Sequence, residues 1–260
     1  MNTVVLAIPF GIVIGLVVGA IGGGGAILAL PVLVYVLGEE VGPASTASLI
    51  IVAIAAGVGA GALALRGHVC WHVALTFVAP AAVASLVGTA ASTAVSAETL
   101  ILAFVPIMLV AAGATWHRAA QAAGDDAGGC PDTHAGAIVV AGVGVGLLTG
   151  FFGVGGGFLI VPVLTMGLGL GFRRAVATSL VIITVTGIAA LASHLAIGSS
   201  IAVGLTVALA LSTGCGALLG SFYAQRVPQA ALGRAFAAVV ALIALFLLVD
   251  TLLLGGPPSA

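Results

Sequence analysis

Long hydrophobic stretches without charge dominate this chain. Residues 3–38, 135–172 and 195–225 contain no Asp, Glu, Lys or Arg. A helix needs about 20 consecutive apolar residues to cross the hydrocarbon core of a bilayer, and each stretch exceeds that length. The pattern therefore predicts an all-α polytopic membrane protein.

Both halves of the chain show the same order of segments: a glycine-broken hydrophobic segment, followed by three uninterrupted transmembrane helices. The first half gives Val4–Ala20 with Ala26–Leu37, then Ala44–Leu65, His72–Ala94 and Thr99–Thr115. The second half gives Gly136–Thr149 with Gly157–Leu168, then Ala175–His194, Ile201–Tyr223 and Leu232–Leu254. The expected domains are a first repeat over 1–115, a polar linker over 116–135 and a second repeat over 136–260.

The two halves also match residue by residue. Gly19–Gly25 and Gly150–Gly156 stand 131 residues apart, and Pro31 and Pro162 keep the same offset. Over residues 19–52, 14 of the 34 aligned pairs are identical, which indicates an internal duplication. Gly/Pro-interrupted hydrophobic segments at matching places in two halves point to a transporter binding site.

The charges help to decide how the repeats relate. If each half crossed the membrane an even number of times, the copies would be parallel and the arginines would face both sides. If each broken segment turns back on itself, all six arginines face one side: Arg66, Arg118, Arg173, Arg174, Arg226 and Arg234. Glu39, Glu40, Glu98 and Asp250 then face the other side. The positive-inside rule favours this second arrangement, which predicts inverted-topology repeats, a cytoplasmic arginine side and both termini outside.

Composition excludes several classes of protein. The chain is 62% hydrophobic and 5% charged, too few charges to cover a soluble domain of 260 residues. Its formal net charge of −1 gives no reason to expect a nucleic-acid partner; membrane lipid surrounds it instead.

The glycine breaks predict an anion-binding site. A helix that starts after each break, at Ala26 or Gly157, points free N–H groups and its positive dipole end into the membrane centre. Backbone N–H groups around the breaks would bind the substrate; the residues are Gly22, Gly23, Gly24, Gly25 and Ala26, and Gly153, Val154, Gly155, Gly156 and Gly157. The alternative is that these glycines serve close helix packing.

Hydroxyl side chains at the start of the next span in each half complete the predicted site. They are Ser45, Thr46 and Ser48 in the first half and Thr178 and Ser179 in the second. They would donate hydrogen bonds to anionic oxygens, or else bond the carbonyls of their own helices.

His194 is the candidate for proton coupling. It falls near the end of a predicted span, where an ionisable side chain is a functional candidate. The alternative is an interfacial histidine bonded to a carbonyl. His68 and His72 fall in a short loop and are expected to be solvated, and Arg173 and Arg174 either attract anions or anchor the topology.

No pattern for catalysis or for a cofactor is present. The chain has no HExxH, no GxSxG and no lysine for a phosphate-binding loop. Cys70, Cys130 and Cys215 are widely spaced, and we expect neither a disulfide nor a metal site from them. The sequence predicts a protein that is not an enzyme, with no catalytic residue, no metal and no cofactor.

The duplicated motifs resemble the sulfite exporter TauE/SafE family. The resemblance rests on Gly19–Leu33 with Ala44–Leu49, on Gly150–Leu164 with Ala175–Leu180, and on His194 followed by Gly198. It implies a secondary transporter, probable exporters being the rule in the family, in the bacterial inner membrane. The implied substrates are small sulfur-containing anions such as sulfite or organosulfonates (sulfoacetate).

The sequence and the resemblance together suggest alternating access with the substrate between the two breaks and protons as the coupling ion. An anion channel and a non-transporting membrane subunit are the rival interpretations. The sequence leaves the exact substrate, the direction of transport and the oligomeric state open.

Overall fold

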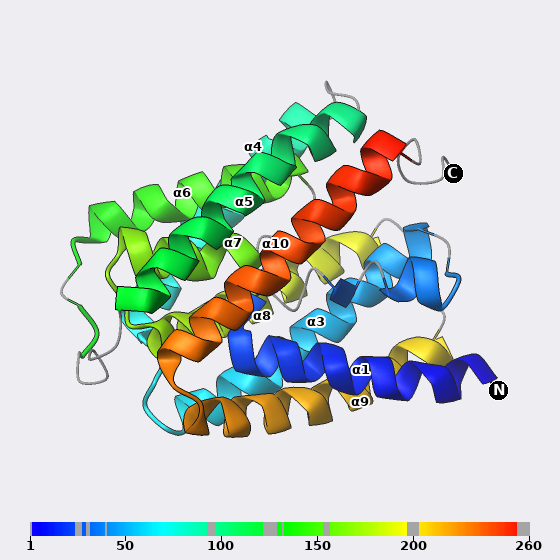
Figure 1. Ribbon diagram of the computed structural model, residues 1–260. Coiled ribbons are helices and arrows are strands. Elements are labelled where there is room, and N and C mark those ends of the chain that lie inside the picture. Colours follow the sequence, from blue (N-terminus) through cyan, green and yellow to red (C-terminus); the bar gives the residue numbers. More distant parts are fainter. Residues whose placement is uncertain are drawn as a thin grey trace.

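The computed structural model describes residues 2–23, 28–29, 32–39, 41–92, 97–121, 129–131, 133–152, 157–196 and 203–253. Within these ranges the regular structure is entirely helical (Figure 1). The first half contains α1 (Asn2–Ile21), η2 (Val32–Val36), α3 (Val41–Ala64), α4 (Trp71–Ser92) and α5 (Ala97–Gln121). The second half contains α6 (Ala135–Phe152), α7 (Gly157–Pro162), η3 (Val163–Gly167), α8 (Phe172–Ala196), α9 (Val203–Tyr223), η4 (Ala224–Arg226) and α10 (Gln229–Leu253).

The helices confirm the predicted multi-pass membrane protein. Among the described residues, seven helices are long and apolar enough to cross a membrane: α3, α4, α5, α6, α8, α9 and α10. Helices can cross lipid because every backbone N–H within them has a partner in its own segment. α5 continues to Gln121, so the polar segment that begins at Trp116 starts as helix.

The two halves repeat the same local structure after each break. η2 and η3 are both five-residue π-helical turns, and they lie 131 residues apart. The residue after each turn donates a hydrogen bond to the carbonyl of its first residue, at 3.1 Å and 3.3 Å. Gly38 and Gly169 then take φ values of +70° and +72°, a conformation that glycine adopts without strain.

Glycines bring two pairs of helices into backbone contact. α1 packs along α9, and α6 packs in the same way along α4. A Cβ added to any of four glycines would overlap a backbone carbonyl of the facing helix; the pairs are Gly15 with Thr213, Gly19 with Ala217, Gly146 with Ala81 and Gly150 with Ser85. Each partner on α9 stands 132 residues after its counterpart on α4, so the same contact is formed twice. Packing by small residues, the alternative considered for the broken motifs, therefore holds for the glycines of α1 and α6 that precede the breaks.

The equivalent helices of the two halves run in opposite directions where they touch. α3 packs against α8 with descending numbers on one helix against ascending numbers on the other; the contacts join Gly59 to Leu180, Gly57 to Thr184 and Ala53 to Gly187. α5 and α10 also pack together, with Trp116 and Ala119 near the end of α5 beside Arg234 and Gly233 near the start of α10.

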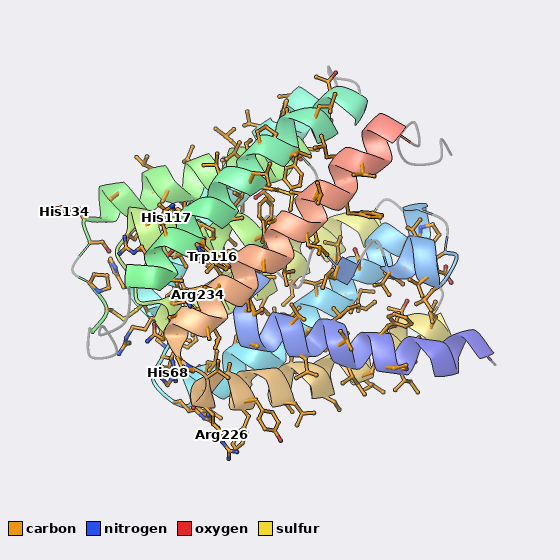
Figure 2. All side chains as sticks on the ribbon, viewed as in Figure 1. His68, Trp116, His117, His134, Arg226 and Arg234 are labelled. Carbon is orange, nitrogen blue, oxygen red and sulfur yellow. A yellow bond between two sulfur atoms is a disulfide. The ribbon has the colours of Figure 1, made fainter. Side chains whose placement is uncertain are left out.

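Arginines from both halves meet at one end of the bundle, which we call the arginine end. Arg66 and Arg226 lie over the same ring, that of Phe222, at 5.3 Å and 5.0 Å from its centroid. Arg174 donates to the Gly67 carbonyl at 3.4 Å. Figure 2 shows Arg226 and Arg234 at this end together with His68, His117 and His134. α1 begins and α10 ends on the opposite side of the picture (Figure 1).

Candidate functional site

The two broken segments touch each other inside the protein. A Cβ added to Gly23 would overlap the carbonyl group of Gly157, and one added to Gly157 would lie 3.0 Å from the Cα of Gly23. Both glycines are buried. We call this contact the glycine junction. The other predicted glycine-site residues, Gly24, Gly25 and Ala26 and the four residues Gly153, Val154, Gly155 and Gly156, lie outside the described residues.

Gly22 places the first break against a hydroxyl of the second half. Its φ is +80°, and a Cβ there would lie 2.9 Å from Ser179 Oγ. Ser179 is fully buried and donates to the Val176 carbonyl at 2.8 Å, one turn earlier in its own helix. Its oxygen keeps lone pairs that can accept a further hydrogen bond.

The other predicted hydroxyls divide into separate environments. Thr178 accepts a hydrogen bond from the Cys70 N–H at 3.1 Å, across 108 residues of sequence. Thr46 is fully buried, Ser48 is half-buried, and each has an interaction partner within the protein. Ser45 lies in α3, and its side chain is outside the description. Of the five hydroxyls, Ser179 is thus the one seen against the glycine junction.

His194 lies in the last turn of α8, but its side chain is also outside the described residues. Its role in proton coupling stays a prediction.

An aromatic side chain packs against both sides of the second break. The Phe104 ring centroid lies 5.0 Å from that of Phe152, which ends α6, and 5.2 Å from that of Phe158 in α7. Phe104 and Phe158 are buried in the main core of the protein. Aromatic pairs at such distances add to the stability gained from burial alone, so α5 fixes the two helix ends relative to each other.

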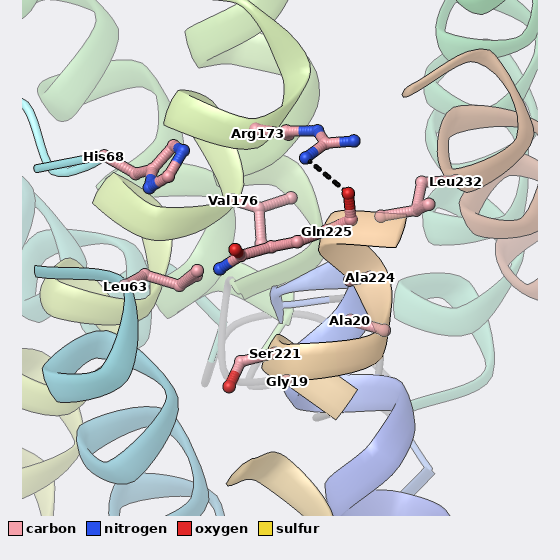
Figure 3. Close-up of a pocket in the computed structure, with 10 residues that line it drawn as sticks. All are labelled: Gly19, Ala20, Leu63, His68, Arg173, Val176, Ser221, Ala224, Gln225 and Leu232. Carbon is pink, nitrogen blue, oxygen red and sulfur yellow. Dashed lines mark hydrogen bonds between the residues drawn. The ribbon is translucent and has the colours of Figure 1, made fainter. Parts of the chain in front are cut away.

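A pocket lies between the glycine junction and the arginine end. It encloses about 300 Å³ and is lined by residues from α1, α3, α8, α9, η4 and α10 and from the loop after α3 (Figure 3). Its polar lining residues are His68, Arg173, Ser221 and Gln225. Val176 lines the pocket and would also lie 3.4 Å from a Cβ at Gly22, so this side chain separates the two regions.

His68 corrects the expectation of a solvated loop histidine. His72 is exposed as expected, but His68 is half-buried, and its Nδ1 is inaccessible to solvent. Burial lowers the pKa of His68 below its ordinary value of 6.5, and the positive charges of Arg174, Arg173 and Arg66 lower the pKa further. The sequence signal was the pair Arg173–Arg174, but nothing local indicated that His68 lies beside it.

The expectation of no disulfide is wrong. Cys70 and Cys130 form one, with their Cα atoms 5.7 Å apart. α4 and α6 run side by side in the same direction, Cys70 directly precedes α4, and Cys130 comes shortly before α6. The two helix starts are therefore neighbours, although the cysteines are 60 residues apart in sequence. Cys215 is free and exposed.

Comparison with known proteins agrees with the membrane fold. Residues 7–247 match the family described as sulfite exporter TauE/SafE. A probable membrane transporter protein of Methanocaldococcus jannaschii is 43% identical over 58 residues, which is 22% of this chain and 21% of that relative. No solved structure matches the chain. Because the family match spans nearly the whole chain, this protein belongs to the sulfite exporter TauE/SafE family of membrane transporters.

Proposed function

We propose that this chain is a secondary transporter that carries small sulfur-containing anions, such as sulfite or organosulfonates, by alternating access at the glycine junction. The observation that carries the proposal is the backbone contact of Gly23 with Gly157, beside the buried hydroxyl of Ser179. Non-helical backbone at membrane depth is tolerated where protein buries it or where it lines a cavity. Glycine lets a ligand approach backbone N–H groups that a side chain would cover.

The substrate class comes from the family. Its printed description names sulfite export, and the M. jannaschii relative is described only as a probable membrane transporter. The chain spans about a fifth of that relative, which therefore adds no information on substrate. Export and the bacterial inner membrane stay part of the proposal.

We further propose that the halves are inverted repeats with the arginine end in the cytoplasm. The antiparallel contact of the equivalent helices α3 and α8 supports this, since a pseudo-two-fold axis in the membrane plane reverses each helix. The meeting of Arg66 with Arg226 at one ring supports a common side for arginines of both halves. Single cysteines at positions 66 and 226 in a cysteine-free background should react from the same face with an impermeant thiol reagent. Reaction from opposite faces contradicts the inverted topology.

Proton coupling through His194 completes the proposal. An imidazole in the last turn of a membrane helix can take up and release a proton near neutral pH. Replacement by alanine should flatten the pH dependence of transport, and an unchanged pH profile removes His194 from the mechanism.

Counterflow in proteoliposomes tests the transport function. Vesicles loaded with unlabelled sulfite should accumulate labelled sulfite transiently, because a carrier exchanges one ion for another across the same site. An anion channel gives flux without counterflow, and a non-transporting subunit gives neither. Parallel trials with sulfoacetate, taurine, thiosulfate and sulfate rank the substrates.

A further inference from the structure

The pocket at the arginine end collects hydrogen-bond donors that have no partner in the protein. Four buried side-chain atoms in the described ranges lack one, and three of them belong to this pocket: His68 Nδ1, Arg173 Nε and Gln225 Nε2. Buried polar groups in folded proteins are nearly always paired. Three unpaired nitrogens in one pocket thus form a set of groups suited to a ligand that accepts hydrogen bonds.

The structure holds two of these groups in a fixed relation. The two terminal nitrogens of Arg173 donate to the carbonyls of Gln225 and Val227, each at 2.9 Å. These bonds orient the guanidinium group, leave its Nε for the pocket, and tie it to the turn that carries Gln225. Figure 3 shows Arg173, Gln225 and His68 around the same space. A preorganised set of donors loses little conformational freedom on binding.

The charge of the lining selects the sign of the ligand. None of the residues that line the pocket is Asp or Glu. Arg173 contributes a positive charge directly, and Arg66 and Arg174 act on the same histidine. A volume of about 300 Å³ is at the lower limit for small-molecule pockets, which favours an ion over a nucleotide.

We propose that His68, Arg173 and Gln225 bind a small oxyanion at the arginine end, and that the anion binds together with a proton on His68. The site is separate from the glycine junction, with Val176 between them. It rests on the proposed function only for the identity of the anion, which is taken from the transported class.

The proton follows from the groups that face His68. Arg66, Arg173 and Arg174 and partial burial keep the free imidazole neutral, and no carboxylate lines the pocket to oppose them. A bound anion offsets the arginines and favours the imidazolium form, which then donates from both ring nitrogens. Anion binding should therefore take up a proton near neutral pH.

Calorimetry on the purified full chain tests the site, with sodium sulfite as the probe and sodium chloride of equal ionic strength as the blank. Gln225→Glu keeps the shape of the side chain but replaces a donor with a negative charge. It should weaken sulfite binding by roughly a hundred-fold or more, the loss of a hydrogen bond to an ion together with a new repulsion. Gln229→Glu introduces the same charge outside the lining and should bind within about twofold of the wild type. Equal affinity in the two variants, or no binding by the wild type, overturns the proposal.

Sodium sulfate is the probe for the proton, because sulfate does not itself gain a proton near neutral pH. Titrations in buffers of different ionisation enthalpy should show proton uptake by the wild type and by His72→Gln, and none by His68→Gln. Equal uptake in His68→Gln overturns the role of His68.

Counterflow with the same variants separates the two proposals. Normal sulfite binding by Gln225→Glu alongside wild-type counterflow rejects this pocket and leaves the transport function standing. Loss of binding in Gln225→Glu when the wild type shows no counterflow keeps the pocket and rejects the transport function.

Discussion

Replacing Gly23 by alanine should disturb the protein more than any other single methyl group added near the breaks. The new Cβ would stand 2.5 Å from the Cα of Gly157 and closer still to its carbonyl group. Ordinary contact for a Cβ begins at 3.4 Å, so the two segments must separate by about 1 Å or more. Overpacking of this kind costs about 1–3 kcal/mol.

The size of the effect follows from that cost. For a chain of this length, 1 kcal/mol corresponds to roughly 2–4 °C in melting temperature, so Gly23→Ala should melt roughly 2–12 °C below the wild type. Gly157→Ala should be milder, because its Cβ meets Gly23 Cα and Ile183 Cδ1 at 3.0 Å, a distance that small movements relieve. Gly144→Ala is the matched control, since a Cβ there meets nothing within 4 Å and a helix gains up to about 1 kcal/mol from the substitution.

Melting of the purified protein in detergent and sulfite counterflow in proteoliposomes are the two assays. Gly23→Ala should lose both stability and counterflow, and Gly144→Ala neither. A Gly23→Ala protein that melts and exchanges sulfite like Gly144→Ala would refute the contact between the two breaks. A Gly157→Ala protein that is much worse than Gly23→Ala would refute the geometry assigned to it.

Three further measurements address other parts of the structure. Gly15→Leu and Gly146→Leu should each prevent assembly to a similar degree, because each places a side chain against a facing carbonyl; purified yield by size-exclusion chromatography measures this, and a large difference contradicts the duplicated packing. His68 has a lowered pKa, so the unfolded chain binds its proton first as pH falls; stability should decline below about pH 6.5 in the wild type and less steeply in His68→Gln, and equal slopes contradict this. Thiol titration of the denatured, unreduced protein should find the single thiol of Cys215, and all three after reduction; reduction should also cost about 4 kcal/mol of stability on the loop-entropy model for a 60-residue separation, unlike Cys215→Ser.

The sequence was sufficient to predict the helices because lipid imposes a simple rule. An uncharged run long enough to cross the bilayer must be helical there, and the predicted span Ile201–Tyr223 differs from α9 only by two residues at its start. The duplication was equally visible, and the two π-helical turns follow it at the same offset. What the sequence left open was the partner of each helix, because Gly15 meets α9 rather than a neighbour in the chain.

The pocket was beyond prediction for the same reason. His68, Arg173 and Gln225 come from three separate parts of the chain and are joined only when α3, α8 and α9 pack with their ends together. The Cys70–Cys130 disulfide likewise depends on α4 and α6 starting side by side. Local patterns describe segments, whereas these sites depend on which helix ends become neighbours.

The duplicated scaffold and the single pocket together predict that transport is unequal from the two faces. The register of the repeats pairs Arg173 with Gly42 and His68 with Ser199, and the α9 register pairs Gln225 with Thr93. None of these counterparts is charged, so the proposed oxyanion site has no equivalent set of residues in the other repeat. Sulfite should therefore half-saturate transport at a lower concentration from the arginine end, and Gln225→Glu should remove the difference. Right-side-out and inside-out vesicles allow the comparison; equal half-saturation in the wild type would mean that the pocket plays no part in recruiting the anion, whatever binds there in detergent.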